Sequence, residues 1–191
     1  MALPARREMT YRVPLPQGDR RMRELIVYIA NKCHTDPTFG ATKLNKILFY
    51  ADFVAFHRDR SAITGEEYQR LENGPAPRRM LPIRQSMEQA GDIVVRPMDY
   101  RGFIQKRVIA LREADLTIFS GADIALVDEV IEAFWGHTAK EISRYSHGPW
   151  WKACFDGESI PYEFTFLSAE PVTDGDSQRA QELAKKYKWP D

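Results

Sequence analysis

The segment from residue 42 to residue 57 constrains the fold most, because apolar side chains surround most of its helical circumference. An aliphatic stripe recurs every three or four positions, and three phenylalanines widen it. These apolar residues are Leu44, Ile47, Leu48, Phe49, Ala51, Phe53, Ala55 and Phe56. A helix that is apolar on most sides must be enclosed by other elements. We therefore expect a central helix here, in the middle of the hydrophobic core.

Further helices are predicted on both sides of this segment. Apolar residues at helical spacing begin at Arg20, and another helix is expected to begin at Ser120. Thr138-Ala-Lys-Glu141 has the capping-box pattern that opens a short helix. Pro82 lies near the start of another and makes its geometry doubtful. The predicted helices are 20–33, 42–57, 78–90, 120–135, 138–145 and 177–187.

One short hairpin follows the helix at 78–90. Residues 93–95 and 106–111 have strand composition and are joined through residues 99–102. The expected fold class is therefore α+β, a mainly helical single domain with a small antiparallel β-hairpin in winged-helix-like order. Residues 1–19 are expected to form an extended arm, residues 20–165 the domain, and residues 166–191 a tail with a polar helix.

Charge and hydropathy limit the classes of function. The 27 basic residues equal the 27 acidic residues, so net charge favours neither nucleic acid nor a membrane surface. No apolar run approaches the roughly 20 residues of a membrane span, and no apolar segment follows the N-terminal arginines as in a secretory signal. We expect a cytoplasmic protein. Cys33 and Cys154 are expected to be reduced, buried thiols, with one disulfide as the alternative.

No motif predicts an enzyme or a cofactor site. Ser146 and His147 are adjacent, and adjacent residues rarely present their side chains to each other as a nucleophile and base. The histidines and cysteines show neither HxxxH nor CxxC spacing, so no metal site is expected. The segment Asn73-Gly74-Pro75 is a turn and lacks the pattern of a phosphate-binding loop. We expect no catalytic residues, no metal and no cofactor.

A DNA-binding regulator is the alternative hypothesis. A helix followed by a basic two-stranded hairpin is the order of elements in a winged helix. The zero net charge of the chain argues against DNA binding. The basic residues that could touch phosphates are Arg78, Arg79, Arg84, Arg96, Arg101, Lys106 and Arg107.

The central segment also carries polar residues. Lys43 and Lys46 flank Asn45 on the polar side of the predicted helix, where a lysine pair is usually exposed to solvent. Asn45 is different, because amides are poor helix formers. Our hypothesis is that Asn45 hydrogen-bonds a neighbouring loop such as the turn at residues 73–75.

Several stretches of the chain, taken in order, resemble the Panacea domain, the domain of SocA-like antitoxins and of phage-associated GepA-type proteins. The likeness spans roughly residues 20–165, with a departure at Arg79-Met-Leu-Pro82. The stretches are TKLNKILFYADF at 42–53, ITGEEY at 63–68, NGPAP at 73–77, ISRYSH at 142–147, WWK at 150–152 and IPY at 160–162. The motif positions expected to form the scaffold are Lys43, Leu44, Asn45, Lys46, Tyr50, Asp52, Asn73, Gly74, Pro75, Ser146 and His147.

The resemblance implies a bacterial antitoxin that neutralises a cognate protein toxin by direct contact. One branch of the family delivers its toxin to a Clp-type protease, and nothing in this sequence selects that mode. The family has no established catalytic residues to carry over. A phage or mobile-element protein that binds a host factor is a third hypothesis.

Contact residues are expected outside the scaffold. Exposed aromatic and arginine side chains dominate interface energies. The candidates lie in the arm, the hairpin and the tryptophan-rich segment, and they are Tyr11, Arg12, Tyr100, Arg101, Trp150 and Trp151.

Overall fold

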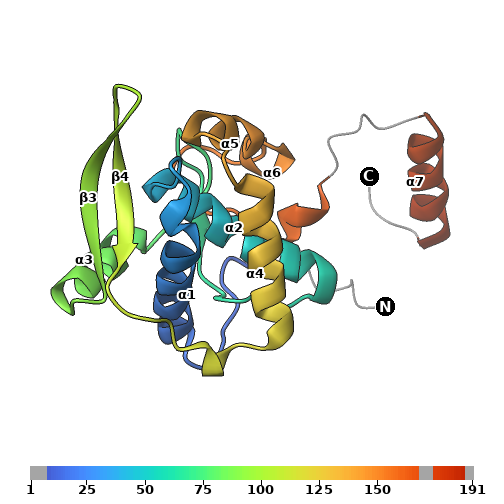
Figure 1. Ribbon diagram of the computed structural model, residues 1–191. Coiled ribbons are helices and arrows are strands. Elements are labelled where there is room, and N and C mark those ends of the chain that lie inside the picture. The colour runs from blue at the N-terminus through green and yellow to red at the C-terminus, as the bar shows by residue number, and fades with distance from the viewer. Residues whose placement is uncertain (1–7, 168–173, 188–191) are drawn as a thin grey trace.

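The computed structural model describes residues 8–167 and 174–187. Within these residues, helices make up most of the regular structure, and two antiparallel hairpins complete it (Figure 1). This confirms the expected mainly helical α+β class. In chain order the elements are α1 (Gly18–Lys32), η1 (Cys33–Thr35), α2 (Ala41–Asp59), β1 (Tyr68–Gln69), β2 (Ala76–Pro77), α3 (Met80–Gln89), β3 (Ile93–Tyr100), β4 (Phe103–Ala110), η2 (Leu116–Ile118), α4 (Gly121–Phe134), α5 (Ala139–Tyr145), α6 (Pro149–Lys152), η3 (Tyr162–Phe166) and α7 (Asp174–Tyr187), where η marks a 3₁₀ helix.

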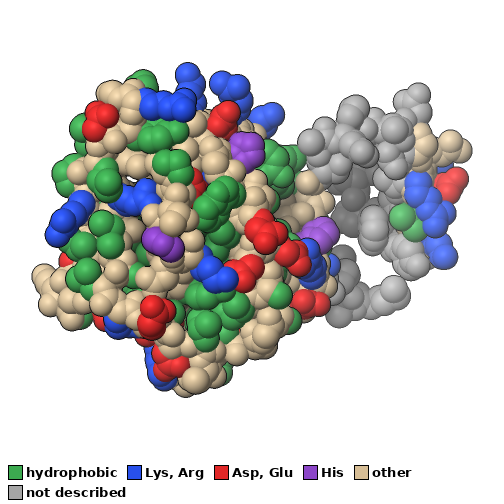
Figure 2. Space-filling view, in the orientation of Figure 1, with side chains coloured by type: hydrophobic (Ala, Val, Ile, Leu, Met, Phe, Trp, Pro, Cys, Tyr) green, Lys and Arg blue, Asp and Glu red, His purple; other side chains and the backbone are tan. Residues whose placement is uncertain are grey.

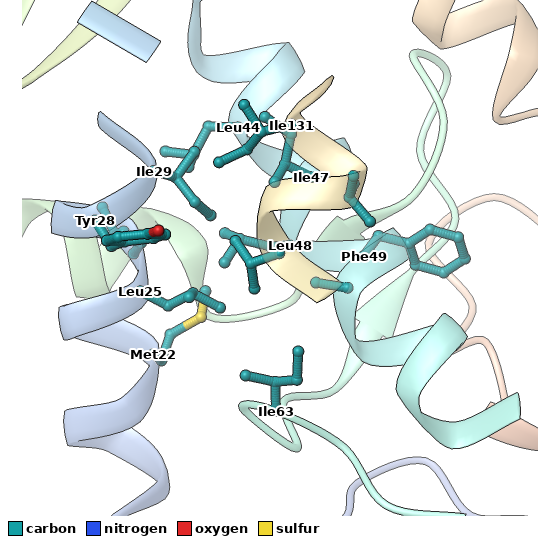
Figure 3. Packing of buried hydrophobic residues seen from close by; sticks show 14 of the residues in the cluster. Met22, Leu25, Tyr28, Ile29, Leu44, Ile47, Leu48, Phe49, Ile63 and Ile131 are labelled. Atoms are coloured by element: carbon teal, nitrogen blue, oxygen red, sulfur yellow. The ribbon is translucent and has the colours of Figure 1, made fainter. Parts of the chain in front are cut away.

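Helix α2 is the centre of the core. It contacts α1, β2, β4, α4, α5 and η3. Its residues Leu44, Ile47 and Leu48 are completely buried and meet Met22 and Leu25 of α1 within one apolar cluster (Figure 3). The prediction of a central helix is confirmed. Its enclosure on all sides explains why so little of the circumference is polar.

Local sequence signals set the starts of α4 and α5. Ser120 and Thr138 each accept a hydrogen bond from the backbone N–H of an acidic residue three positions later, whose side chain accepts one in return. Pro82 is the third residue of α3, where a backbone N–H would have no acceptor within the helix. The proline is therefore compatible with the helix, and the doubt about this segment is resolved.

The hairpin of β3 and β4 is longer than the sequence predicts. The strands pair antiparallel from Ile93 with Ala110 to Tyr100 with Phe103. Arg101 and Gly102 form the two-residue turn with φ values of 54° and 83°, the left-handed backbone that a type I′ turn requires. The sequence does not predict the outer half of the hairpin because Pro97 interrupts the first strand and the apolar residues there, such as Phe103 and Ile104, do not alternate with polar ones. It projects beside the helical body (Figure 1).

A second, very short hairpin surrounds the Asn73-Gly74-Pro75 turn. Strands β1 and β2 pair through Tyr68 with Pro77 and Gln69 with Ala76. The sequence predicts the turn, but the short strands beside it are too small to carry a recognisable period.

The described part of the N-terminal arm is held against the domain. The Thr10 carbonyl accepts a hydrogen bond from Tyr162 N at 2.8 Å, and Val13 N donates to the Gly65 carbonyl at 3.1 Å. The predicted arm and tail extend into residues 1–7, 168–173 and 188–191, which lie outside the described residues. Within the described segments, no helix combines the length and the apolar character that crossing a bilayer requires.

Candidate functional site

Lys43 is buried and fully paired. Its Nζ lies 2.7 Å from Asp36 Oδ2, 2.6 Å from Thr38 Oγ1 and 2.9 Å from the Phe134 carbonyl. Burial acts to raise the pKa of Asp36, but hydrogen bonds from Lys43 and Thr38 outweigh it and lower that pKa. The expectation that Lys43 faces solvent is wrong. The residue ties the loop before α2 to the end of α4.

Lys46 is equally buried, with 1% of its surface exposed, but it has no acid beside it. Its Nζ donates to the Pro75 carbonyl at 2.8 Å, and no other hydrogen bond to it occurs among the described residues. Burial lowers the pKa of Lys46 to about 7. The residue that holds the turn at 73–75 is therefore Lys46. The predicted residue, Asn45, has a buried Oδ1 with no hydrogen-bond partner in this part of the structure.

The Lys46 side chain, the turn and the end of α5 meet closely. Gly74 has φ of 89°, and a Cβ there would overlap Ser146 Oγ and lie 2.8 Å from Lys46 Cε. Ser146 Oγ donates to the Ser143 carbonyl at 2.7 Å, so its proton is not directed to His147. The His147 ring stacks on Trp151 with centroids 4.0 Å apart. This arrangement serves packing, and it does not form a nucleophile–base pair.

Asp52 accepts hydrogen bonds from two motif stretches that lie far apart in the sequence. Its carboxylate accepts hydrogen bonds from the backbone N–H groups of Ile63 and Thr64 at 2.8 and 2.7 Å, and from the Thr64 hydroxyl. The hydroxyls of Tyr68 and Tyr162 donate to it at 2.9 and 3.3 Å. Burial raises the pKa of Asp52, and these donors oppose that rise. The carboxylate therefore organises the core where the stretches at 63–68 and 160–162 converge on α2.

Of the other motif residues, Leu44, Tyr50 and Pro75 pack within the domain, whereas Asn73 does not. Leu44 is completely buried. Tyr50 packs its ring against Phe134 and Trp150, and its hydroxyl oxygen is buried without a hydrogen-bond partner among the described residues. Asn73 is exposed, whereas Pro75 is buried. None of these side chains lines an open site.

An open, mainly apolar groove lies between the hairpin tip and the starts of α2 and α5. This groove has a volume of about 590 Å³ and is lined mainly by apolar atoms. Phe103 and Ile104 at its edge are 76% and 70% exposed. Figure 2 shows the hollow beside the hairpin, with hydrophobic and basic side chains around it. Exposed apolar surface of this kind is typical of interaction sites.

The groove has a basic rim. Arg101, Lys106 and Lys140 line it, and none of the three has an ion-pair partner among the described residues. No Asp or Glu contributes to its lining. The groove therefore presents apolar contact area together with a positive field.

The structure separates the predicted contact residues. Tyr100 and Arg101 line the groove. Tyr11 is 43% exposed in the arm, and Arg12 forms an ion pair there with Asp19 at 3.7 Å.

Both tryptophans among the predicted contacts are tied to the scaffold. Trp150 Nε1 donates to the Ser146 carbonyl at 3.2 Å. Trp151 Nε1 donates to the Leu71 carbonyl at 2.9 Å. Sequence reasoning missed Phe103 and Ile104, although apolar residues directly after a tight turn were the available signal.

Several of the basic residues considered for DNA contacts are already engaged. Arg78 and Arg79 pair with Glu67 and Glu66 at 2.9 and 2.7 Å. Arg107 is buried and donates to four carbonyls in η1 and the loop that follows it. The Arg107 bonds anchor β4 to η1 and the loop after it. These partners leave none of the three arginines free to contact phosphates.

The remaining chemistry-bearing residues form no site within residues 8–167 and 174–187. Cys33 and Cys154 are both free and buried, and burial raises the pKa of Cys33 to about 12. No group of three or more His, Cys, Asp or Glu side chains in this part of the chain could hold a metal ion.

A buried polar scaffold beside an open apolar groove is typical of a protein-binding domain. Comparison with protein-family models identifies the family of this domain. The model of the SocA-like antitoxin Panacea domain matches residues 44–152, more than half of the chain. The chain therefore belongs to this antitoxin family, as its motifs indicate. Comparisons with curated proteins and with solved structures gave no match.

Proposed function

We propose that this protein is an antitoxin that binds its cognate toxin directly through the groove between the β3–β4 hairpin and the starts of α2 and α5. It acts by binding and not by catalysis. Tyr100 and Arg101 are contact residues in this proposal, together with Phe103 and Ile104. Family membership supports the role, and the exposed apolar groove supports the place.

The exposure of Phe103 carries the site assignment. A phenylalanine that leaves 76% of its surface in water contributes little to its own fold. Burying such an aromatic ring against a partner contributes strongly to affinity. The buried motif residues keep the groove in shape, so they affect neutralisation only through the fold.

The test is co-expression with the small reading frame that neighbours this gene. That product should prevent growth when it is expressed alone, and the wild-type protein should restore growth. Phe103→Ser should abolish the rescue and weaken binding of the purified toxin at least about tenfold, because an aromatic ring buried against a partner is worth about 1.4 kcal/mol or more.

Phe155→Ser is the matched control. Phe155 is 81% exposed and does not line the groove. This variant should rescue growth like the wild type. The groove assignment is wrong if both variants lose the rescue of growth equally, or if neither loses it. The antitoxin role is wrong if the neighbouring product is harmless when expressed alone. The toxin's half-life in the cell separates masking, which leaves it stable, from delivery to a Clp-type protease, which shortens it.

A further inference from the structure

The turn at Arg101–Gly102 determines which backbone groups of the hairpin face outward. A two-residue β-turn joins Tyr100 and Phe103 by a hydrogen bond, so these residues form a hydrogen-bonded pair. Because such pairs alternate with non-hydrogen-bonded pairs, the next pair, Asp99 with Ile104, directs its N–H and C=O groups away from the hairpin. The Leu111 N to Asp92 carbonyl bond of 2.9 Å at the hairpin base fits the same alternation.

The free edge of β3 is closed to an added strand. Val95 N, which faces outward by this alternation, donates to Glu88 Oε1 at 2.9 Å. Pro97, the next outward position, has no N–H to donate. Prolines and side-chain caps of this kind protect sheet edges from pairing with other chains.

The free edge of β4 has no such protection near the tip. Lys106 directs its carbonyl to the start of α2, since a Cβ on Gly40 would lie 3.5 Å from that oxygen. Ile104, two residues nearer the tip, presents its N–H and C=O on the same edge, where the groove opens. Neither group has a hydrogen-bond partner in the described part of the chain.

The groove indicates what would cover this edge. An extended segment can satisfy the Ile104 backbone groups, whereas a helix satisfies only its own. Alternate side chains of such a segment face the apolar wall around Phe103. The rim cations Arg101, Lys106 and Lys140 favour carboxylates at the remaining positions.

We propose that β4 binds an extended acidic segment of the partner protein as an added strand that pairs with the Ile104 backbone. This inference rests on the proposed function, because it specifies the part of the toxin that enters the groove. Strand addition gives affinity through the backbone, and the groove selects alternating apolar and acidic side chains.

A synthetic peptide tests this without knowledge of the toxin. The probe is an eight-residue peptide, roughly a strand's length, in which Glu alternates with Val, and the control peptide carries Lys in place of Glu. The Glu peptide should bind the full chain and slow amide hydrogen exchange at Ile104 at least about tenfold, while exchange at Asp99 stays unchanged. No binding of the Glu peptide at about 1 mM, which corresponds to roughly 4 kcal/mol, would overturn the proposal. Binding with equal affinity for the Lys peptide, or without protection of Ile104, would also overturn it.

Two substitutions separate the backbone from the side chain. Ile104→Pro removes the outward N–H and should abolish binding of the Glu peptide, whereas Ile104→Val keeps the N–H and should bind within about threefold of wild type. Asp99→Pro is the matched control, since it makes the same change at the paired residue on the opposite edge. It should keep the affinity, and far-ultraviolet circular dichroism verifies that each variant is folded.

The two proposals fail in different ways. If the wild type neutralises the neighbouring toxin but the Ile104 amide stays unprotected by both the Glu peptide and the toxin, strand addition is wrong and the antitoxin role stands. If the peptide pairs with Ile104 but no toxicity is rescued, the groove is a strand-binding site of a protein that is not an antitoxin.

Discussion

Lys43 and Lys46 lie one helical turn apart on α2, have the same exposure of 1%, and differ in what surrounds their charge. Lys43 meets the carboxylate of Asp36, a hydroxyl and a carbonyl. Lys46 meets one carbonyl, and nearby His147 has a pKa lowered first by burial and then by the charges of Lys46 and Arg70. An unpaired buried ammonium costs several kcal/mol unless it loses its proton. Lys46 is therefore the residue where protonation and stability should be coupled most strongly.

The pH dependence of stability should reveal Lys46. Its pKa falls from 10.5 to about 7 on folding, so between these values the unfolded chain binds more protons than the folded one. The contribution of Lys46 to the free energy of unfolding therefore rises with pH, by at most about 1.4 kcal/mol per unit. Lys46→Met should remove this dependence. Urea unfolding at pH 6.5, 7.5 and 8.5 gives the free energy of unfolding of both proteins. The difference between wild type and Lys46→Met should increase with pH.

Lys106→Met provides the control for that measurement, because Lys106 is exposed on the groove rim. The free energy of unfolding of Lys106→Met should differ from that of wild type by the same amount at all three pH values. A Lys46→Met difference that is equally flat would show that Lys46 keeps its ordinary pKa in the folded protein.

At the scale of elements, the turn between β1 and β2 is held by its fit against α2 and α5. Gly74 is needed there for two reasons, a φ of 89° and the absence of space for a Cβ. Gly91, which follows the last turn of α3, shares the first requirement with φ of 75°, but a Cβ added there would meet no atom within 4 Å. The pair therefore separates the conformational cost from the packing cost.

Gly74→Ala should destabilise the protein much more than Gly91→Ala. The left-handed backbone alone costs about 1 kcal/mol for alanine. Because the added Cβ must also displace Ser146 and Lys46, Gly74→Ala should lower the free energy of unfolding by roughly 3 kcal/mol or more. Urea unfolding gives both values, and near-equal losses would mean that the turn can move away from α5 without cost.

The elements differ in how far the sequence predicts them. Helix α2 and the capped starts of α4 and α5 follow from local patterns, because their signals lie within a few residues. The burial of Lys46 does not, since its acceptor on Pro75 comes from 29 residues away. The groove is less predictable still, because the hairpin, α2 and α5 enclose it only after packing. Only Tyr100 and Arg101 of its lining were identified from sequence as contact residues.

At the scale of the whole molecule, charge pairing favours a protein over a nucleic acid as the partner. The chain carries 27 basic and 27 acidic residues. Arg78, Arg79 and Arg112 are paired with carboxylates, and Arg107 is bound to carbonyls. The basic rim of the groove is thus a small local field, suited to a few carboxylates. It does not form the long stripe that a duplex backbone would need.

Binding to DNA should therefore be weak. A basic surface of only a few free cations neutralises few phosphates, so the slope of log affinity against log salt should be shallow, about −3 or less in magnitude. Fluorescence anisotropy with a random duplex of about 20 base pairs, roughly two helical turns, should give a dissociation constant above about 0.1 mM near physiological salt. Micromolar binding with a steep salt slope would instead favour the winged-helix hypothesis. In that case Arg96→Ala and Lys106→Ala should each reduce the slope by about one, because each would remove one phosphate contact.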